Sequence, residues 1–243
     1  MKAEEVKPYD NDAAKTGQVR EMFNSIAPAY DVMNRMMTLG IDTIWRRKAV
    51  DMVGKYNPRR VLDVATGTGD LAFLIDKRVR PEQLLGIDLS EGMLAIAREK
   101  ALQKGVADRL SFAVEDCLSL SLPDNSYDAI TVAYGVRNFE NLKQGFAEMY
   151  RVLAPGGVLC VIELSTPEHF PMRQLYKFYT YTIIPLVGRI VSRDKQAYSY
   201  LPRSVAAVAQ GEEMLDIFRS VGFKNCRLRR LTFGACTIYM GEK

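Results

Sequence analysis

The sequence predicts an α/β fold built on a doubly wound, mostly parallel sheet of seven strands that ends in an antiparallel pair. Short β-rich runs alternate with helical stretches across residues 61–164, as in consecutive βαβ units. Two of these runs, Leu84–Leu89 and Val158–Leu164, are almost continuously apolar, as strands covered on both faces are. The last two runs, residues 226–231 and 236–240, are joined by a short turn containing glycine, which indicates an antiparallel pair.

Chain length and composition fit one globular α/β domain. The chain has 243 residues, of which 48% are apolar and 26% are charged, the balance of an ordinary globular protein with a core. Its 33 basic and 29 acidic residues are mostly scattered, so we expect no nucleic-acid partner. The short basic runs at residues 46–48 and 227–230 are interpreted as solvated surface.

The cellular compartment is inferred from the absence of three sequence features, which are a membrane-spanning run, a secretory signal and paired cysteines with C-x-x-C spacing. No run of about 20 apolar residues occurs, so we expect no membrane span. Residues 1–12 are polar and charged, unlike a secretory signal. Four cysteines without C-x-x-C spacing and one histidine, His169, argue against a metal site and fit a reducing compartment. We therefore expect a cytoplasmic protein without a bound metal.

The chain divides into an extension and a main domain. Residues 1–56 carry apolar residues at helical spacing, interrupted at Pro28, and are interpreted as a helical extension that caps the active site. Residues 57–243 form the main domain, within which 166–202 is an apolar and aromatic insertion on the substrate side. The later helices expected in this domain cover residues 91–104 (with Ser90 as N-cap), 140–153 and 212–221.

A glycine-containing loop follows the first strand, residues 61–65. Gly67 and Gly69, with Thr68 between them, let the backbone approach a ligand closely at the start of the next helix. Asp88 ends the second strand, where a carboxylate can accept hydrogen bonds from both ribose hydroxyls of an adenosine group. These residues alone also fit a dinucleotide-binding fold, because the loop satisfies the looser form of that fingerprint.

Further acidic residues favour an adenosine ligand that carries an amino-acid end. Asp63 lies in the first strand, just before the loop, where it suits a cationic amino-acid group better than a pyrophosphate. Asp116, which follows the third strand together with Cys117, can accept a hydrogen bond from an adenine amino group. Each acid alone could be an ordinary turn or capping residue. Together, at the carboxyl ends of successive strands, they favour S-adenosylmethionine as the cofactor.

Four longer motifs carry a resemblance to a known family. They are residues 30–34 with Gly40 and Trp45, residues 135–139, residues 151–157 with Glu163 and Ser165, and residues 198–202. They are similar to motifs of the ubiquinone/menaquinone C-methyltransferases, and the resemblance runs from about Val19 to the C-terminus. It implies a class I S-adenosylmethionine-dependent methyltransferase fold.

The sequence departs from this family's pattern at three positions. Thr38 stands where a serine is usual. Asp42 stands where a histidine is usual, so a catalytic role of that histidine does not carry over. Ala133 stands where many members have a serine near the cofactor, which removes one side-chain contact.

The resemblance implies methyl transfer to a ring carbon of a polyprenylated quinol. We expect demethylmenaquinol as the substrate and menaquinol as the product. A polyprenyl methoxy-benzoquinol on the way to ubiquinone is the alternative, which the motifs do not separate. Other classes that remain open are a methyltransferase for another small molecule, a nicotinamide-dependent oxidoreductase and a non-enzymatic binding module.

Methylation of a quinol carbon requires a phenolate, because loss of the neighbouring hydroxyl proton makes that carbon nucleophilic. Arg137 and Asn138 follow the fourth strand, where substrate and cofactor meet, and a fixed cation can stabilise the phenolate. Asp31 is the candidate base, and Tyr30 and Tyr134 can orient the ring. The competing interpretation pairs Arg137 with a nearby acid and uses Asn138 as a helix cap.

Two further features concern the surface. His169 lies between prolines and is expected in an exposed loop, away from the chemistry. Residues 178–191 are aromatic and apolar but too short to span a bilayer. They fit either a core helix or a hydrophobic wall for the polyprenyl tail that touches the membrane surface. Besides the quinol, the partner options are thus peripheral contact with the inner face of a membrane and a second copy in a homodimer.

Overall fold

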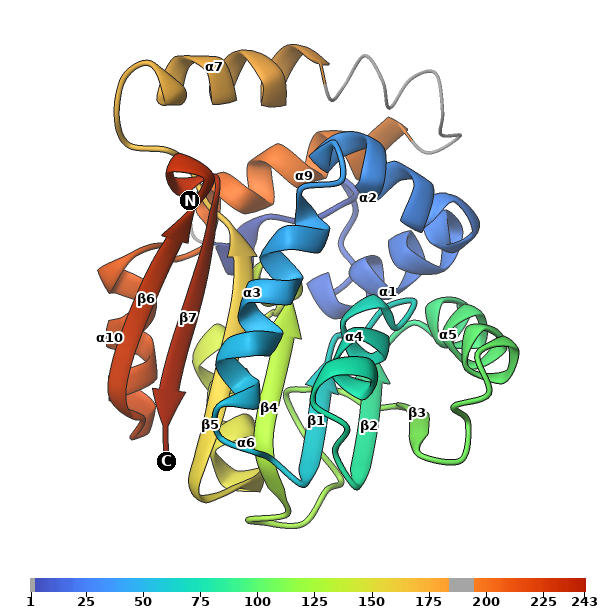
Figure 1. The fold of residues 1–243 in the computed structure, drawn as a ribbon. Coiled ribbons are helices and arrows are strands. Elements are labelled where there is room, and N and C mark those ends of the chain that lie inside the picture. The colour runs from blue at the N-terminus through green and yellow to red at the C-terminus, as the bar shows by residue number, and fades with distance from the viewer. Residues whose placement is uncertain (1–2, 184–194) are drawn as a thin grey trace.

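The structure is a computed structural model that describes residues 3–183 and 195–243. Its centre is a seven-stranded sheet in the order β3-β2-β1-β4-β5-β7-β6 (Figure 1). The strands are β1 (Arg60–Val64), β2 (Gln83–Asp88), β3 (Leu110–Val114), β4 (Tyr127–Ala133), β5 (Leu153–Leu164), β6 (Lys224–Leu231) and β7 (Cys236–Glu242). Strands β1 to β5 pair in parallel, whereas β7 is antiparallel to both of its neighbours. The predicted fold class is confirmed.

Helices cover both faces of the sheet. The helices are α1 (Lys15–Ile26), α2 (Tyr30–Thr38), α3 (Asp42–Gly54), α4 (Asp70–Arg78), α5 (Glu91–Gln103), α6 (Leu142–Val152), α7 (Met172–Phe178), α9 (Lys195–Ala207) and α10 (Glu212–Val221). Single turns are η1 (Ala3–Glu5), η2 (Ala27–Ala29), η3 (Val136–Asn138), the π-helical η4 (Tyr179–Ile183) and η5 (Thr232–Gly234). In Figure 1, α3 and α4 lie in front of the sheet, and α6 and α10 lie behind it.

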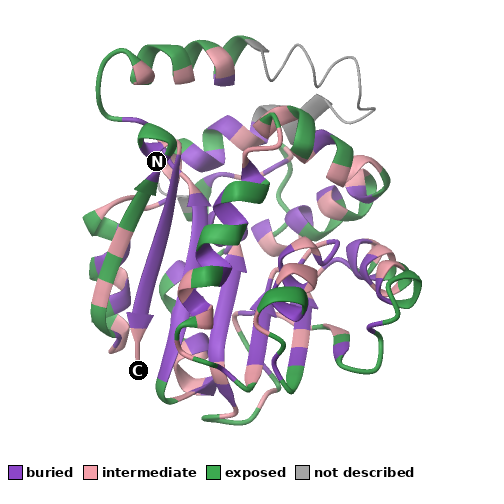
Figure 2. Ribbon diagram, viewed as in Figure 1, coloured by how far each residue is buried: buried purple, intermediate pink, exposed green. Residues whose placement is uncertain are grey.

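The strands supply one hydrophobic core to each face. Leu62 and Ile130 pack with Phe146 of α6 in one core, whereas the neighbouring Val61 and Ala129 belong to the other core with α3 and α4. This alternation follows from the two-residue period of a strand. Both faces are therefore buried, as Figure 2 shows for the central strands, and the apolar runs in the sequence are explained.

The predicted start of helix α5 is accurate because the sequence carries a clear N-cap residue, Ser90, whereas the predicted start of the fifth strand differs from the structure. Ser90 caps α5, its hydroxyl accepting from the Met93 amide at 3.2 Å. The fifth strand differs, since β5 begins at Leu153 rather than Val158. Leu153 pairs with Tyr127, and the register then shifts before Val158 pairs with Ala129. The predicted glycine turn is thus a bulge inside the strand, made possible at Gly156 by a φ of 77°.

The N-terminal helices lie at the edge of the sheet where the parallel strands end (Figure 1). As predicted, the helical region breaks at Pro28, which lies in η2 between α1 and α2. Lys15 of α1 ties this region to the segment after β4, because its Nζ donates to the carbonyl oxygens of Arg137 and Phe139 at 3.0 and 3.2 Å. Burial lowers the pKa of Lys15 to about 8.

The apolar insertion supplies α7, η4 and α9 at the same edge. Among the described residues, no helix combines the length and apolar character needed to cross a membrane. The predicted apolar run 178–191 is described only as far as Ile183, and the rest of it lies outside the described residues. Phe178 and Tyr181 are exposed, so this described part is not a core helix.

We expect Phe146→Ala to destabilise the fold strongly. The ring is fully buried between α6 and the sheet, where it contacts Phe218 edge-on with centroids 4.7 Å apart. Its removal should lower the free energy of unfolding by about 3–5 kcal/mol, through lost burial and the cavity left behind. Urea denaturation measures the change. Phe178→Ala, at an exposed site, is the matched control and should shift stability by less than about 0.5 kcal/mol. Equal effects of the two variants would contradict this core.

Candidate active site

A pocket lies at the carboxyl ends of β1 to β4, the edge at which open α/β sheets bind ligands. Its empty volume is about 730 Å³, part of which is open to solvent. Seven of the residues predicted from the sequence line it: Tyr30, Gly67, Asp88, Asp116, Cys117, Tyr134 and Asn138. We call it the strand-end pocket.

Asp88 and the glycine loop form one side of this pocket. The Asp88 carboxylate accepts from the backbone amides of Gly67 at 2.8 Å and Ser90 at 2.9 Å. Burial raises the pKa of Asp88, and these amides oppose that rise. A carboxylate has about four acceptor positions, so two remain for a ligand. Gly67 has a φ of 58°, a conformation that favours glycine, and it brings the loop backbone to the pocket wall.

Asp63 lies beneath the glycine loop and is not among the residues that line the strand-end pocket. It is buried, and its two oxygens accept from the hydroxyls of Thr66 at 2.7 Å and Thr131 at 2.6 Å. Burial raises its pKa to about 6, although both hydroxyl groups stabilise the carboxylate. Asp63 therefore joins the loop to β4. A direct contact with the amino-acid end of a ligand stays a prediction.

The segment after β3 brings Asp116 and Cys117 to the lining of the same pocket. One Asp116 oxygen accepts from the Leu118 amide at 2.9 Å, which leaves the other oxygen for a ligand. Cys117 is buried, and burial raises the pKa of its thiol. It therefore acts as a small apolar wall.

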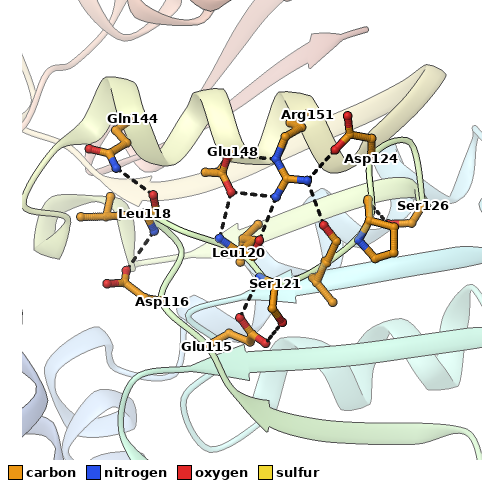
Figure 3. Close-up of polar contacts among 12 residues, drawn as sticks. Glu115, Asp116, Leu118, Leu120, Ser121, Asp124, Ser126, Gln144, Glu148 and Arg151 are labelled. Atoms are coloured by element: carbon orange, nitrogen blue, oxygen red, sulfur yellow. Dashed lines mark hydrogen bonds and ion pairs between the residues drawn. The ribbon is translucent and has the colours of Figure 1, made fainter.

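Arg151 of α6 holds this segment in place (Figure 3). Its guanidinium donates to the carbonyl oxygens of Leu120 and Leu122, each at 2.9 Å, and pairs with Glu148 at 2.8 Å. Glu148 in turn accepts from the Leu120 amide at 2.9 Å. Arg151, the first residue of the family-like motif at 151–157, thus positions the loop that carries Asp116.

Thr68 and Asp31 meet outside the pocket. The Thr68 hydroxyl donates to Asp31 at 2.6 Å, and Lys100 Nζ donates to the other Asp31 oxygen at 2.5 Å. Burial favours the neutral carboxyl, but the hydrogen bonds from Lys100 and Thr68 and the Lys100 charge outweigh it, so the pKa of Asp31 is lowered. Asp31 fastens α2 to the glycine loop. The structure does not bring it to either pocket described here, where a base would have to lie; Thr68 and Gly69 likewise lie outside the pocket lining.

A second and larger pocket adjoins the first. Its empty volume is about 1050 Å³, part of which is open to solvent. It is lined mainly by apolar and aromatic side chains from α2, α3, the α7–η4 segment, α9 and η5. Trp45, the single tryptophan of the chain, lies in its wall and donates from Nε1 to the Thr232 hydroxyl at 2.8 Å. Tyr30 and Tyr134 line both pockets and so separate them. We call it the apolar pocket.

Arg137 enters the apolar pocket from η3. Its side chain is buried and pairs with Glu163 of β5 at 2.7 Å, and it also donates to the Tyr134 carbonyl oxygen. Burial alone would lower the pKa of Arg137, but the Glu163 charge outweighs this and keeps the guanidinium protonated. The pairing with a nearby acid is thus confirmed, yet Nε has no hydrogen-bond partner among the described residues.

Asn138 does not cap a helix. Helix α6 is capped by Asn141, whose side chain accepts from the Gln144 amide at 3.0 Å. Asn138 instead accepts from the Tyr200 hydroxyl of α9 at 3.1 Å and lines the strand-end pocket. His169 is exposed, as predicted.

The interpretation of residues 46–48 as solvated surface is wrong for Arg46. Arg47 and Lys48 are exposed, whereas Arg46 is only 7% exposed, pairs with Asp42 one turn earlier and lines the apolar pocket. The three consecutive basic residues look equivalent in the sequence. In a helix, however, neighbouring residues point in different directions, so one of them can be buried while the others are exposed. The spacing of four between Asp42 and Arg46 was the signal for an ion pair on one helix face.

Comparisons with known proteins agree with this geometry. The model of the ubiE/COQ5 methyltransferase family matches residues 11–243. A demethylmenaquinone methyltransferase of Bacteroides fragilis is 51% identical over 240 residues, which cover 99% of this chain and 98% of the relative. A relative of the same name from Porphyromonas gingivalis is 46% identical over 241 residues, covering 99% and 98% of the two chains.

A solved structure supports the fold independently. A SAM-dependent methyltransferase from Thermotoga maritima superposes with a TM-score of 0.62 at 18% identity, covering 92% of this chain and 99% of that one. This likeness supports the α/β fold described above. The chain belongs to the ubiE/COQ5 methyltransferase family.

Proposed function

We propose that the protein transfers the methyl group of S-adenosylmethionine to a ring carbon of a polyprenylated demethylmenaquinol, giving menaquinol. The observation that carries this proposal is the pair of adjoining pockets that share Tyr30 and Tyr134 as their common wall. One pocket has the backbone loop and free carboxylate positions that an adenosine ligand needs. The other is apolar, with buried cationic groups that suit an aromatic ring bearing oxygens.

The residues of the strand-end pocket fit the cofactor. Asp88 retains acceptor positions for the ribose hydroxyls, Asp116 retains one oxygen for the adenine amino group, and Gly67 allows close backbone approach. Cys117 offers an apolar surface beside the base. When bound there, S-adenosylmethionine supplies an electrophilic methyl group.

Arg137 is proposed to stabilise the phenolate form of the substrate. Glu163 holds the guanidinium in place, and Nε has no hydrogen-bond partner in the part of the chain that the structure describes. Because the pocket is apolar, a preorganised donor there acts more strongly on a developing negative charge than it would in water. Asn138, next in the chain, reaches the strand-end pocket, so this pair of residues spans the region between the two ligands.

The substrate assignment rests on the apolar pocket together with the relatives' names. Two relatives at 46% and 51% identity are named demethylmenaquinone methyltransferase. The direct test is incubation with S-adenosylmethionine labelled in its methyl group and a short-chain demethylmenaquinol, followed by mass analysis. We expect label on the naphthoquinol ring carbon. A polyprenyl methoxy-benzoquinol is tested in parallel. If only this benzoquinol becomes labelled, the proposed substrate is wrong and the alternative substrate takes its place.

A membrane contact is proposed for the α7–η4 segment. Leu175, Phe178 and Tyr181 are exposed, and Arg173 and Lys177 lie beside them. Tyr176 and Tyr179 of the same segment line the apolar pocket, so the segment borders both the pocket and the surface. Exposed apolar side chains flanked by basic ones favour binding to an anionic lipid surface. A homodimer and the cytoplasmic location stay predictions.

Asp88→Ala should weaken binding of S-adenosylmethionine strongly. Losing the hydrogen bonds from two ribose hydroxyls to one carboxylate should cost about 2–4 kcal/mol. Isothermal calorimetry measures the dissociation constant. Glu91→Ala, an exposed acid in the first turn of α5, is the matched control and should bind normally. If affinity for Asp88→Ala changes less than about fivefold while the fold is intact, the ribose assignment is wrong.

Arg137 should act on turnover rather than on cofactor binding. Because removing Arg137 alone would strand the buried Glu163, the test uses Arg137→Met with Glu163→Gln. We expect near-normal affinity for S-adenosylmethionine and single-turnover methylation slower by at least ~30-fold, a low estimate for a lost donor at an oxyanion. The matched control, Arg59→Met with Glu82→Gln, removes an exposed ion pair by the same two substitutions. Near-normal turnover would make the buried pair purely structural.

Replacing Leu175 and Phe178 by serine should reduce membrane binding. Each exposed apolar side chain contributes on the order of 1 kcal/mol at a lipid interface, so the double variant should bind at least about fivefold more weakly. Co-sedimentation with vesicles of anionic and zwitterionic phospholipids measures this. Leu102→Ser, at an exposed site on α5, is the control. Unchanged sedimentation of the double variant would place the contact elsewhere or exclude it.

A further inference from the structure

Among the described residues, two buried cationic groups line the apolar pocket, and the proposed chemistry uses only one of them. Arg46 of α3 is the second. Its guanidinium pairs with Asp42, which also accepts from the Thr38 hydroxyl at 2.8 Å. Arg46 and Arg137 are each 7% exposed, and each has its own carboxylate partner.

Arg46 and Tyr134 both line this pocket, and each has one buried polar atom without a strong partner in the described part of the chain. Among the described residues, neither Arg46 Nε nor the Tyr134 hydroxyl has a hydrogen-bond partner of nitrogen or oxygen. The Cys236 thiol lies beside the hydroxyl and offers only a weak interaction. The guanidinium lies over the Tyr134 ring, 5.1 Å from its centroid. Two unsatisfied buried donors therefore belong to one cluster, and buried donors are rarely left unpaired in a folded protein.

We propose that Arg46 and Tyr134 form a second oxygen-binding site, which holds the quinol oxygen across the ring from the one next to the methyl-accepting carbon. This inference rests on the proposed function. A quinol ring carries two oxygens on opposite sides, and the pocket carries two separate buried arginines. Burial raises the pKa of Tyr134 well above its ordinary value, so its hydroxyl keeps its proton and donates.

The position of each arginine decides which oxygen it takes. Gly135 and Asn138, close to Arg137 in the chain, line the strand-end pocket, so Arg137 lies toward the cofactor. Asp42 and Trp45, close to Arg46, line the apolar pocket but not the strand-end pocket. Arg137 therefore receives the oxygen beside the reacting carbon, and Arg46 receives the distant one. Two fixed points orient the ring plane, which a single contact cannot do.

The test compares two ligands that differ only in the distant oxygen. One is short-chain demethylmenaquinol, and the other is 3-geranyl-1-naphthol, which keeps the hydroxyl next to the acceptor carbon. The protein is loaded with S-adenosylhomocysteine so that no methyl transfer occurs. Quenching of Trp45, the single tryptophan, which lies in the pocket wall, gives each dissociation constant.

Two variants probe the site, and a third serves as control. Tyr134→Phe removes only the hydroxyl, which has no strong partner to lose. Arg46→Met with Asp42→Asn removes the cation without stranding its carboxylate. For the quinol we expect dissociation constants about three- to tenfold higher in Tyr134→Phe and at least about tenfold higher in the double variant. The naphthol should change less than about twofold in both. Arg47→Met, at the exposed neighbouring position, should leave both constants unchanged.

The outcomes separate this inference from the proposed function. If the unaltered protein binds neither ligand, the proposed function fails and this site fails with it. If it binds the quinol but the variants lose both ligands equally, or lose neither, the second oxygen site is wrong and the proposed function stands. The latter result would mean that a buried water, rather than a ligand oxygen, satisfies these donors.

Discussion

The buried ion pair between Arg137 and Glu163 fixes the point at which the two pockets meet. It joins the turn after β4 to the neighbouring strand β5, and Lys15 docks α1 on the carbonyl oxygen of the same arginine. Removing two charges from water is costly, and the cost is offset only when the geometry is good and further hydrogen bonds are made. Glu163 meets this condition by also accepting from backbone amides. Helix α1, the turn after β4 and strand β5 are thus joined at one ion pair in the wall of the apolar pocket.

The wall between the pockets is built under a second constraint, close backbone approach. A Cβ added to Gly135 would lie 2.6 Å from the Ala65 Cβ, so the turns after β1 and β4 can come together only with glycine there. Tyr134, immediately before it, has a φ of 59°, a conformation that costs a bulky residue about 1–3 kcal/mol and is found mainly at functional sites. That conformation allows the Tyr134 carbonyl oxygen to accept from Arg137 while its ring faces both pockets.

The sequence predicted the sheet and most of the strand-end pocket, because both follow from local patterns. Apolar runs gave the strands, and acids after successive strands had to meet at one edge, as Asp88 and Asp116 do. The pocket-side role of Arg46 was missed, since it depends on which face of α3 packs against the rest of the protein. The hydrogen bonds of Asp31 with Thr68 and Lys100 were not predicted, because both partners lie far from it in the chain. Long-range pairing of charges has no local signal.

The charge balance of the apolar pocket fits a neutral substrate that becomes anionic only during reaction. An unpaired arginine in such a pocket would bind any anion and would carry a large desolvation cost. Here Arg137 is neutralised by Glu163, and Arg46 is neutralised by Asp42, with the Asp70 carboxylate 3.9 Å away. A neutral quinol can therefore enter and a neutral product can leave. Under the proposed function, the guanidinium donors that have no partner among the described residues would stabilise a phenolate as it forms without retaining one afterwards.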